Sequence, residues 1–131
     1  MITHVTTISI FVTDQDRALD FYVNKLGFEQ RRDDPMGQSA PRWIEVAPPG
    51  AQTALVLFKP TREMPGASSF EAAVAHIGSF APFIFNVDDM QATHRELTAR
   101  GVEFSDPPAK QPWGWWATIK DPDGNLIGLH Q

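Results

Sequence analysis

Short runs of β-branched and aromatic residues surround one helical pattern in the first half of the chain. Val5–Thr13 has the length and composition of a strand. Apolar residues then recur at helical spacing over positions 18–26, with Asp14 as the candidate N-cap and Gly27 as the residue that ends the helix. The extended segments predicted after this helix are Phe28–Arg32, Pro41–Val46 and Thr53–Lys59. This half therefore reads as strand, helix and three strands.

The second half repeats that order. Pro82–Val87 predicts a strand, Asp88 or Asp89 can cap the next helix, and Gly101 ends it. The segments predicted after this helix are a short extended run at Val102–Phe104, a break at Asp106-Pro107-Pro108, and a hairpin formed by Trp115–Lys120 and Asn125–His130. The order of elements is again strand, helix and three strands.

Landmarks in the two halves recur at one spacing. Gly27 and Gly101 are 74 residues apart, and so are Gly50 and Gly124. We therefore expect an α+β fold of two tandem βαβββ modules that form a curved mixed sheet around a cleft. Module one spans 1–60 and module two spans 80–131. The linker between them, 61–79, is expected to hold one short helix at Phe70–His76.

Composition narrows the class of protein. The 131 residues include no cysteine, which excludes a disulfide scaffold, a zinc–thiolate site and a thiol nucleophile. The longest apolar stretch, near Phe80–Val87, is too short to cross a bilayer, and no basic segment precedes an apolar one at the N-terminus. We expect a cytoplasmic domain that binds no membrane. A net charge of −5 disfavours nucleic acid as a partner.

Two motifs resemble one known family. The segment Ile8–Tyr22 (ISIFVTDQDRALDFY), followed by Lys25–Phe28 (KLGF), resembles the opening of the vicinal oxygen chelate superfamily. Lys120–Leu126 (KDPDGNL) resembles its closing motif. The superfamily includes glyoxalase I, extradiol dioxygenases and bleomycin-resistance proteins. The resemblance covers almost the whole chain, and it implies the paired-module fold more strongly than any one activity.

The resemblance also implies four places where metal-using members hold a ligand, one on each of four strands. Counting from the matched motifs carries these places onto Thr7, Leu57, Pro82 and Gly128. None of these residues offers an imidazole or a carboxylate, whereas a divalent ion needs about three such ligands. We therefore expect no metal and no other cofactor.

Strand alternation from those four places predicts the lining of the cleft. The predicted ligand-binding residues are Thr7, Ser9, Phe11, Leu55, Leu57, Pro82, Asn86, Trp113, Trp116, Gly128 and His130. A bulged hairpin with Asp121 opposite Asn125 pairs Trp116 with His130, so Trp116 faces the cleft. Trp115 then faces the helix side, and the 74-residue repeat predicts the same for Trp43.

Within the vicinal oxygen chelate superfamily, a chain with no metal ligands and an aromatic cleft is most similar to the metal-free, bleomycin-resistance-like branch. That likeness implies a homodimer that sequesters a hydrophobic antibiotic of the bleomycin, mitomycin or enediyne type. The moderate charge favours a neutral, planar aromatic ligand. One alternative is a metal-independent lyase or isomerase in which His130, Asn86, Ser9 or Lys59 transfers protons. Another is a ligand-free interaction module with a collapsed cleft.

Overall fold

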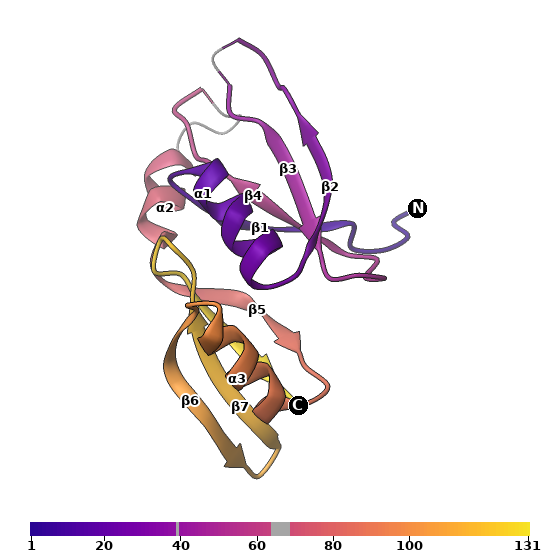
Figure 1. Ribbon diagram of the computed structural model, residues 1–131. Coiled ribbons are helices and arrows are strands. Elements are labelled where there is room, and N and C mark those ends of the chain that lie inside the picture. Colours follow the sequence, from indigo (N-terminus) through magenta and orange to yellow (C-terminus); the bar gives the residue numbers. More distant parts are fainter. Residues whose placement is uncertain (39, 64–68) are drawn as a thin grey trace. The chain divides into compact units, whose positions relative to one another are not determined.

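The computed structural model describes residues 1–38, 40–63 and 69–131. It divides the chain into two compact units, Met1–Ile77 and Gly78–Gln131. Each unit holds one open four-stranded mixed sheet with a helix packed against it (Figure 1). The predicted α+β class and the strand–helix–three-strand order are confirmed. Among the described helices, none is long and apolar enough to span a membrane.

The first unit is built on the sheet order β1-β4-β3-β2, with β1 parallel to β4 and the other pairs antiparallel. Its elements are β1 (Thr7–Phe11), α1 (Gln15–Asp20), the π-helical turn η1 (Phe21–Lys25), β2 (Glu29–Asp34), β3 (Trp43–Ala47), β4 (Ala54–Phe58) and α2 (Ser69–His76). Helix α2 confirms the short helix predicted at Phe70–His76. Positions 64–68 of the predicted linker lie outside the described residues.

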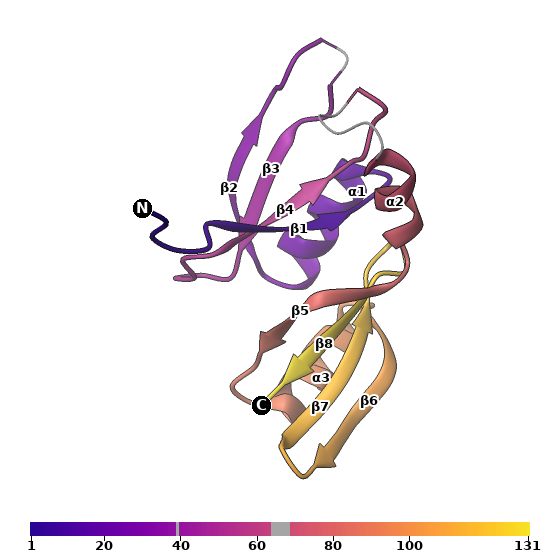
Figure 2. The same cartoon turned by 180° about the vertical axis from the view of Figure 1, so that it is seen from behind.

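The second unit repeats the arrangement with the order β5-β8-β7-β6, where β5 and β8 are parallel. Its elements are β5 (Phe80–Asn86), α3 (Met90–Ala99), β6 (Glu103–Gln111), β7 (Gly114–Lys120) and β8 (Leu126–His130). In Figure 2 this sheet lies in front of α3, so the viewer sees the face that the helix does not cover.

Both principal helices begin and end as their sequences predict. The Asp14 carboxylate accepts a hydrogen bond from Arg17 N at 3.0 Å, and Asp89 accepts one from Ala92 N at 2.9 Å. These bonds satisfy amide groups that a first helical turn leaves without partners. Gly27 and Gly101, which follow the helices, have φ angles of 80° and 85°. Glycine adopts this left-handed conformation without the strain that a side chain would add.

Strand β6 corrects one sequence prediction. We expected Asp106-Pro107-Pro108 to break the chain, but β6 continues through it, with register shifts on both sides of Asp106. The physical reason is that β6 pairs with β7 alone and forms the edge of the sheet. Proline lacks an N–H donor, and an edge strand tolerates that loss on its open side or at a bulge.

The helix-covered faces of the two sheets form the hydrophobic core of each unit. In the first unit, this face contains Ile10, Ile44, Val46, Leu55 and Leu57, all at most 5% exposed. In the second, Ala117, Ile119, Ile127 and Leu129 are at most 2% exposed. Helical residues such as Tyr22 and Met90 are also fully buried. Removing this apolar surface from water stabilises each unit.

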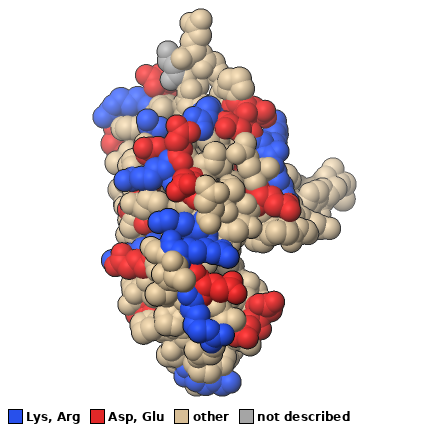
Figure 3. Space-filling model, in the orientation of Figure 1, with Lys and Arg blue, Asp and Glu red and all other residues tan. Residues whose placement is uncertain are grey.

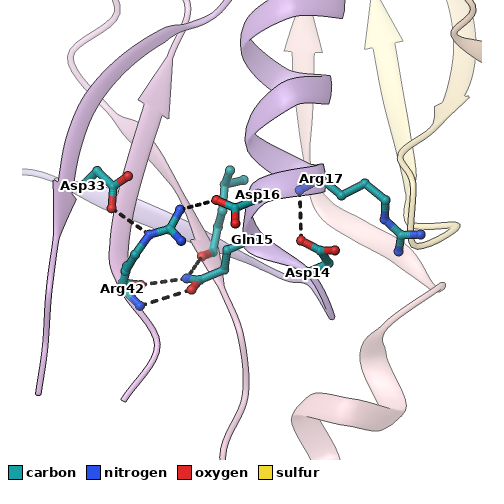
Figure 4. A network of polar contacts seen from close by, with 7 residues as sticks. Asp14, Gln15, Asp16, Arg17, Asp33 and Arg42 are labelled. Atoms are coloured by element: carbon teal, nitrogen blue, oxygen red, sulfur yellow. Dashed lines mark hydrogen bonds and ion pairs between the residues drawn. The ribbon is translucent and has the colours of Figure 1, made fainter. Parts of the chain in front are cut away.

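A polar network joins α1 to the strands beside it (Figure 4). The buried Gln15 amide donates to Arg42 O at 2.7 Å and to Leu57 O at 2.9 Å, and it accepts from Arg42 N at 3.1 Å. The Arg42 guanidinium pairs with Asp16 at 2.6 Å and with Asp33 at 2.9 Å. The hydrogen bond from Arg42, followed by its charge, lowers the pKa of Asp16.

Candidate functional site

The face of the second sheet opposite α3 collects aromatic and aliphatic side chains. Its register pairs Ile84 with Gly128 on one side and Thr118 with Gly128 on the other. It also pairs His130 with both Asn86 and Trp116. The predicted hairpin register is therefore confirmed, and Pro82, Asn86, Trp116, Gly128 and His130 share this open face.

Phe80 and Ile84 add an exposed apolar edge to the open face of the second sheet. Phe80 is 50% exposed and Ile84 is 54% exposed, whereas their neighbour Ala81 on the other face is 7% exposed. Large apolar side chains that gather on an exposed surface indicate a place for a ligand or a partner.

Trp116 is the centre of this face. Its ring stacks on Phe80, with 6.5 Å between ring centroids and 10° between ring planes. The six-membered ring lies directly over Gly128, where an added Cβ would overlap it. Trp116 Nε1 donates to Thr118 Oγ1 at 3.2 Å. Because its N–H is satisfied within the sheet, the indole presents an apolar surface to anything that binds there.

Trp113 lies in the turn between β6 and β7, at the end of the same sheet. Its side chain is 64% exposed, and its carbonyl oxygen lies 3.0 Å from His130 Nε2. The next residue, Gly114, has φ 124°, and an added Cβ would collide with Gln131 O. Gln131 in turn pairs with Trp115 through two backbone hydrogen bonds of 3.1 Å. The C-terminal residues thus fix this turn and the indole that it carries.

The first sheet presents a second open face, and here part of the predicted lining is wrong. The parallel register pairs Ser9 with Val56 and Phe11 with Phe58, so Thr7, Ser9 and Phe11 share a face with Ala54, Val56 and Phe58. Leu55 and Leu57 point to the opposite, helix-covered face and are 3% and 0% exposed. Counting from the matched motifs misplaced β4 by one residue, and a shift of one residue moves every side chain of a strand to the opposite face.

Trp43 also lies on this open face, contrary to the prediction that it packs beneath the helix. Its ring meets Phe58 edge-on, with centroids 6.4 Å apart at 85°, and Phe58 meets Phe11 at 6.1 Å. Trp43, Phe58 and Phe11 form an aromatic cluster on the face opposite the buried Ile44 and Val46.

The reason for the error is that the spacing between equivalent residues changes along the modules. Val12 N donates to Phe58 O, and Val87 N donates to His130 O, so Phe58 and His130 are equivalent and 72 residues apart. It follows that Val56 corresponds to Gly128. Two antiparallel pairs then match across the units, Glu45 with Val56 and Thr118 with Gly128. Trp43 therefore corresponds to Trp116, at a spacing of 73.

This equivalence also corrects the places implied for metal ligands. In the first unit they are Thr7 and Val56, and in the second they are Pro82 and Gly128. The side chains at these places offer no imidazole and no carboxylate. Among the described residues, no group of three or more His, Asp or Glu side chains could hold a metal ion. The residues present do not fit the metal of the metal-using proteins that the chain resembles.

A separate hollow of about 260 Å3 opens on the first unit beside the Arg42 network. Its lining is Gln15, Ala40, Pro41, Arg42, Lys59 and Thr61, which includes none of the predicted ligand-binding residues.

Of the residues considered for proton transfer, the structure brings Asn86 and His130 together on adjacent strands. Ser9 and Lys59 belong to the first unit. On the surface seen in Figure 3, acidic and basic side chains are interspersed.

Comparisons with known proteins identify one superfamily. A family model described as the Glyoxalase/Bleomycin resistance protein/Dioxygenase superfamily matches residues 2–129. TnmS3, an antibiotic binding protein from Streptomyces sp. CB03234, is 40% identical, with a TM-score of 0.78 over 99% of this chain and 96% of that chain. A superfamily member from Sphaerobacter thermophilus is 38% identical, with a TM-score of 0.84 over 98% and 97% of the two chains. YetH of Bacillus subtilis is 35% identical over the full length of both chains.

Proposed function

This chain belongs to the glyoxalase/bleomycin resistance/dioxygenase superfamily, and we propose from that premise that it binds and sequesters a hydrophobic, planar aromatic antibiotic or related natural product. The superfamily carries several activities, so the function follows from the residues of the site and not from the fold. The main observation that supports ligand binding is the stack of Trp116 on the exposed Phe80, with the Trp116 ring lying over Gly128.

A flat aromatic ligand matches this wall of the second sheet. Phe80 and Ile84 leave about half of their surface in contact with water, and Trp116 presents an indole whose N–H is already bonded. Each offset or edge-on aromatic pair contributes about 0.5–1.5 kcal/mol beyond simple area burial. Ligand sites typically combine such apolar walls with a few polar groups, here Asn86 and His130.

Binding without turnover is part of the proposal. His130 Nε2 already contacts the Trp113 carbonyl, and none of the residues on this face forms a nucleophile–base pair among the described contacts. The likeness to TnmS3, an antibiotic binding protein, supports the same reading. We extend the proposal to a homodimer, in which a second copy covers the exposed Phe80 and Ile84 and completes a cleft around the ligand.

The test is a tryptophan-fluorescence titration with bleomycin, mitomycin and planar anthraquinone or enediyne compounds. Each compound is recovered afterwards, and its molecular mass is measured by mass spectrometry to detect any chemical change. We expect saturable quenching by a planar compound that is recovered unchanged. A turnover product would overturn sequestration, and the absence of quenching by any compound would overturn the proposed ligand class.

A matched pair of variants locates the site. Trp116→Leu removes the indole from the open face, whereas Trp115→Leu removes the neighbouring indole from the opposite face. We expect the first variant to weaken binding about tenfold, since it loses one stacking partner and its buried area, and the second to change it less than twofold. The reverse order would place the ligand on the helix side.

A further inference from the structure

The equivalent pairs Trp116–Thr118 and Trp43–Glu45 differ in one respect. In the second unit, the indole N–H donates to the hydroxyl two residues along the same strand. In the first unit, Trp43 and Glu45 stand at the same two positions of β3. Within the described part of the chain, Trp43 Nε1 donates to no acceptor. In the second unit, Trp116 and Thr118 are hydrogen-bonded to each other. In the first unit, no described hydrogen bond joins the Trp43 donor to the Glu45 acceptor.

Glu45 is a carboxylate held in an unusual place. It lies on β3 with a side chain that is 12% exposed, on the same face as the fully buried Val56. Among the residues that the structure describes, the one cation in contact with the Glu45 carboxylate is Arg32, whose Nε lies 3.9 Å away, beyond hydrogen-bond length. That guanidinium is bound more closely by Asp34, at 2.6 Å and 2.9 Å. Glu45 thus keeps acceptor capacity that no described side chain fills.

We propose that the first unit's open face also binds a planar aromatic compound, and that Glu45 is the specificity-determining residue of this face, which accepts a hydrogen bond from a hydroxyl or amino group of the compound. The inference rests on the proposed function and extends it to the first unit and to the polar substituent of the ligand. Trp43 Nε1 is the complementary donor, placed for a neighbouring carbonyl of the same ligand. The aromatic cluster of Trp43, Phe58 and Phe11 supplies the contact surface beside these two groups.

The physical basis is the cost of leaving a carboxylate partly buried without a donor. A ligand with a donor at that place replaces the water that Glu45 would otherwise need, and bonds to charged groups are the stronger class. A ligand with a methyl group at that place displaces the same water from the Glu45 carboxylate and forms no hydrogen bond in its place. The first unit therefore discriminates between ligands of the same shape, whereas the closed Trp116–Thr118 pair does not.

Two compounds of matched shape test this inference, 2-aminoanthraquinone and 2-methylanthraquinone, titrated against tryptophan fluorescence. We expect the wild-type protein to bind the amino compound about tenfold more tightly. Glu45→Ala should remove that preference while leaving affinity for the methyl compound within twofold. Glu45→Gln, which keeps an acceptor oxygen without the charge, should retain part of it.

The matched control is Glu29→Ala. Glu29 also lies 3.9 Å from an arginine, Arg31, but its side chain is 56% exposed at the sheet edge, so its removal takes away the same charge and a similar ion pair from a solvated place. We expect this variant to keep the full preference. A preference that persists in Glu45→Ala, or equal binding of the two compounds to wild type, would overturn this inference and leave the proposed function standing. Failure of both compounds to bind a wild-type protein that binds a planar compound of the first titration would overturn this inference alone, and failure of every compound in both titrations would overturn the proposed ligand class as well.

Discussion

The two units build the same open face with different residues at its centre. In the second, Gly128 leaves room for the Trp116 ring to lie directly on the sheet and to reach Thr118. In the first, the equivalent position is Val56, and Trp43 turns edge-on to Phe58 instead. Two differences, Val56 for Gly128 and Glu45 for Thr118, thus accompany the change from an apolar stacking wall to a face whose polar groups have no hydrogen-bond partner among the described residues.

The turns before the last strand of each module differ as well. In the second unit, the Asp121 carboxylate accepts from Asp123 N, Asn125 N and Asn125 Nδ2 at 2.8–2.9 Å. In the first, the equivalent turn closes through Ala51 N to Pro48 O at 3.0 Å, and the Arg31 guanidinium of the neighbouring strand donates to Ala51 O and to Pro48 O. The hairpin that carries Trp116 is thus fixed by a carboxylate within its own turn, whereas the turn of the first unit is held by a side chain from the neighbouring strand.

Gly128→Val is expected to have the largest effect on the difference between the two units. It places a side chain where the Trp116 ring now lies and converts the second unit toward the arrangement of the first. We expect a loss of about 3 kcal/mol in the free energy of unfolding from overpacking, together with weaker ligand binding. Thermal unfolding measures the loss of stability, and the tryptophan-fluorescence titration measures the loss of binding.

The double variant Gly128→Val/Trp116→Ala provides the control. Removing the ring should relieve the overlap, so the two substitutions should cost less together than the sum of their separate costs. Wild-type stability and binding in Gly128→Val alone would contradict the account of the wall.

Asp121→Ala should have the next largest effect. Asp121 is 5% exposed, and its removal leaves the amides of Asp123 and Asn125 without their acceptor. We expect a loss of about 2 kcal/mol in the free energy of unfolding, measured by chemical denaturation. Ala51→Gly in the turn of the first unit should cost less, and an equal cost would remove the contrast between the turns.

Thr118→Val should have a smaller effect, because it keeps the shape of a fully buried side chain and removes one acceptor. The Trp116 N–H then resembles that of Trp43 in having no acceptor within its sheet. We expect a loss of about 1 kcal/mol, seen as a lower unfolding midpoint in denaturant. Thr118→Ser, which keeps the hydroxyl, should retain the bond, and an unchanged midpoint in Thr118→Val would show that the bond contributes nothing.

The smallest effect is a pH dependence confined to the first unit. Arg42 lowers the pKa of Asp16 in the folded state, so this pair contributes stability that is present above the unfolded-state pKa and is lost as pH falls through the lower folded value. The loss should therefore appear below about pH 4. Unfolding midpoints measured across that range should depend less on pH in Asp16→Asn, whereas Asp20→Asn, which removes the carboxylate bonded to Asn24, should keep the wild-type profile.

Much of the fold could be predicted because local residues determine it. Asp14 and Asp89 cap the helices, Gly27 and Gly101 follow them, and Gly124 adopts φ 79° in the predicted bulged turn. That turn sets the hairpin register, which is why the facing of Trp116 was predicted correctly.

The errors arose where no local signal sets the register. The spacing between equivalent residues is 75 at Asp14 and Asp89 but 72 at Phe58 and His130, so a constant repeat cannot place β3 and β4. Trp43 was therefore assigned to the wrong face, and counting from the matched motifs misplaced Leu57 by one residue. The missed residues Trp43 and Glu45 become identifiable once the strand pairing is known.

The most direct test of the account is the set of four indole N–H signals in a nitrogen–proton correlation spectrum, assigned by single Trp→Phe variants and followed during titration with 2-aminoanthraquinone. We predict saturable shifts of the Trp116 and Trp43 signals with the Trp115 signal unchanged, since Trp115 alternates with Trp116 and lies on the helix-covered face of the second sheet. Shifts confined to Trp115, or no shift in any signal at a saturating concentration, would contradict binding at the open faces.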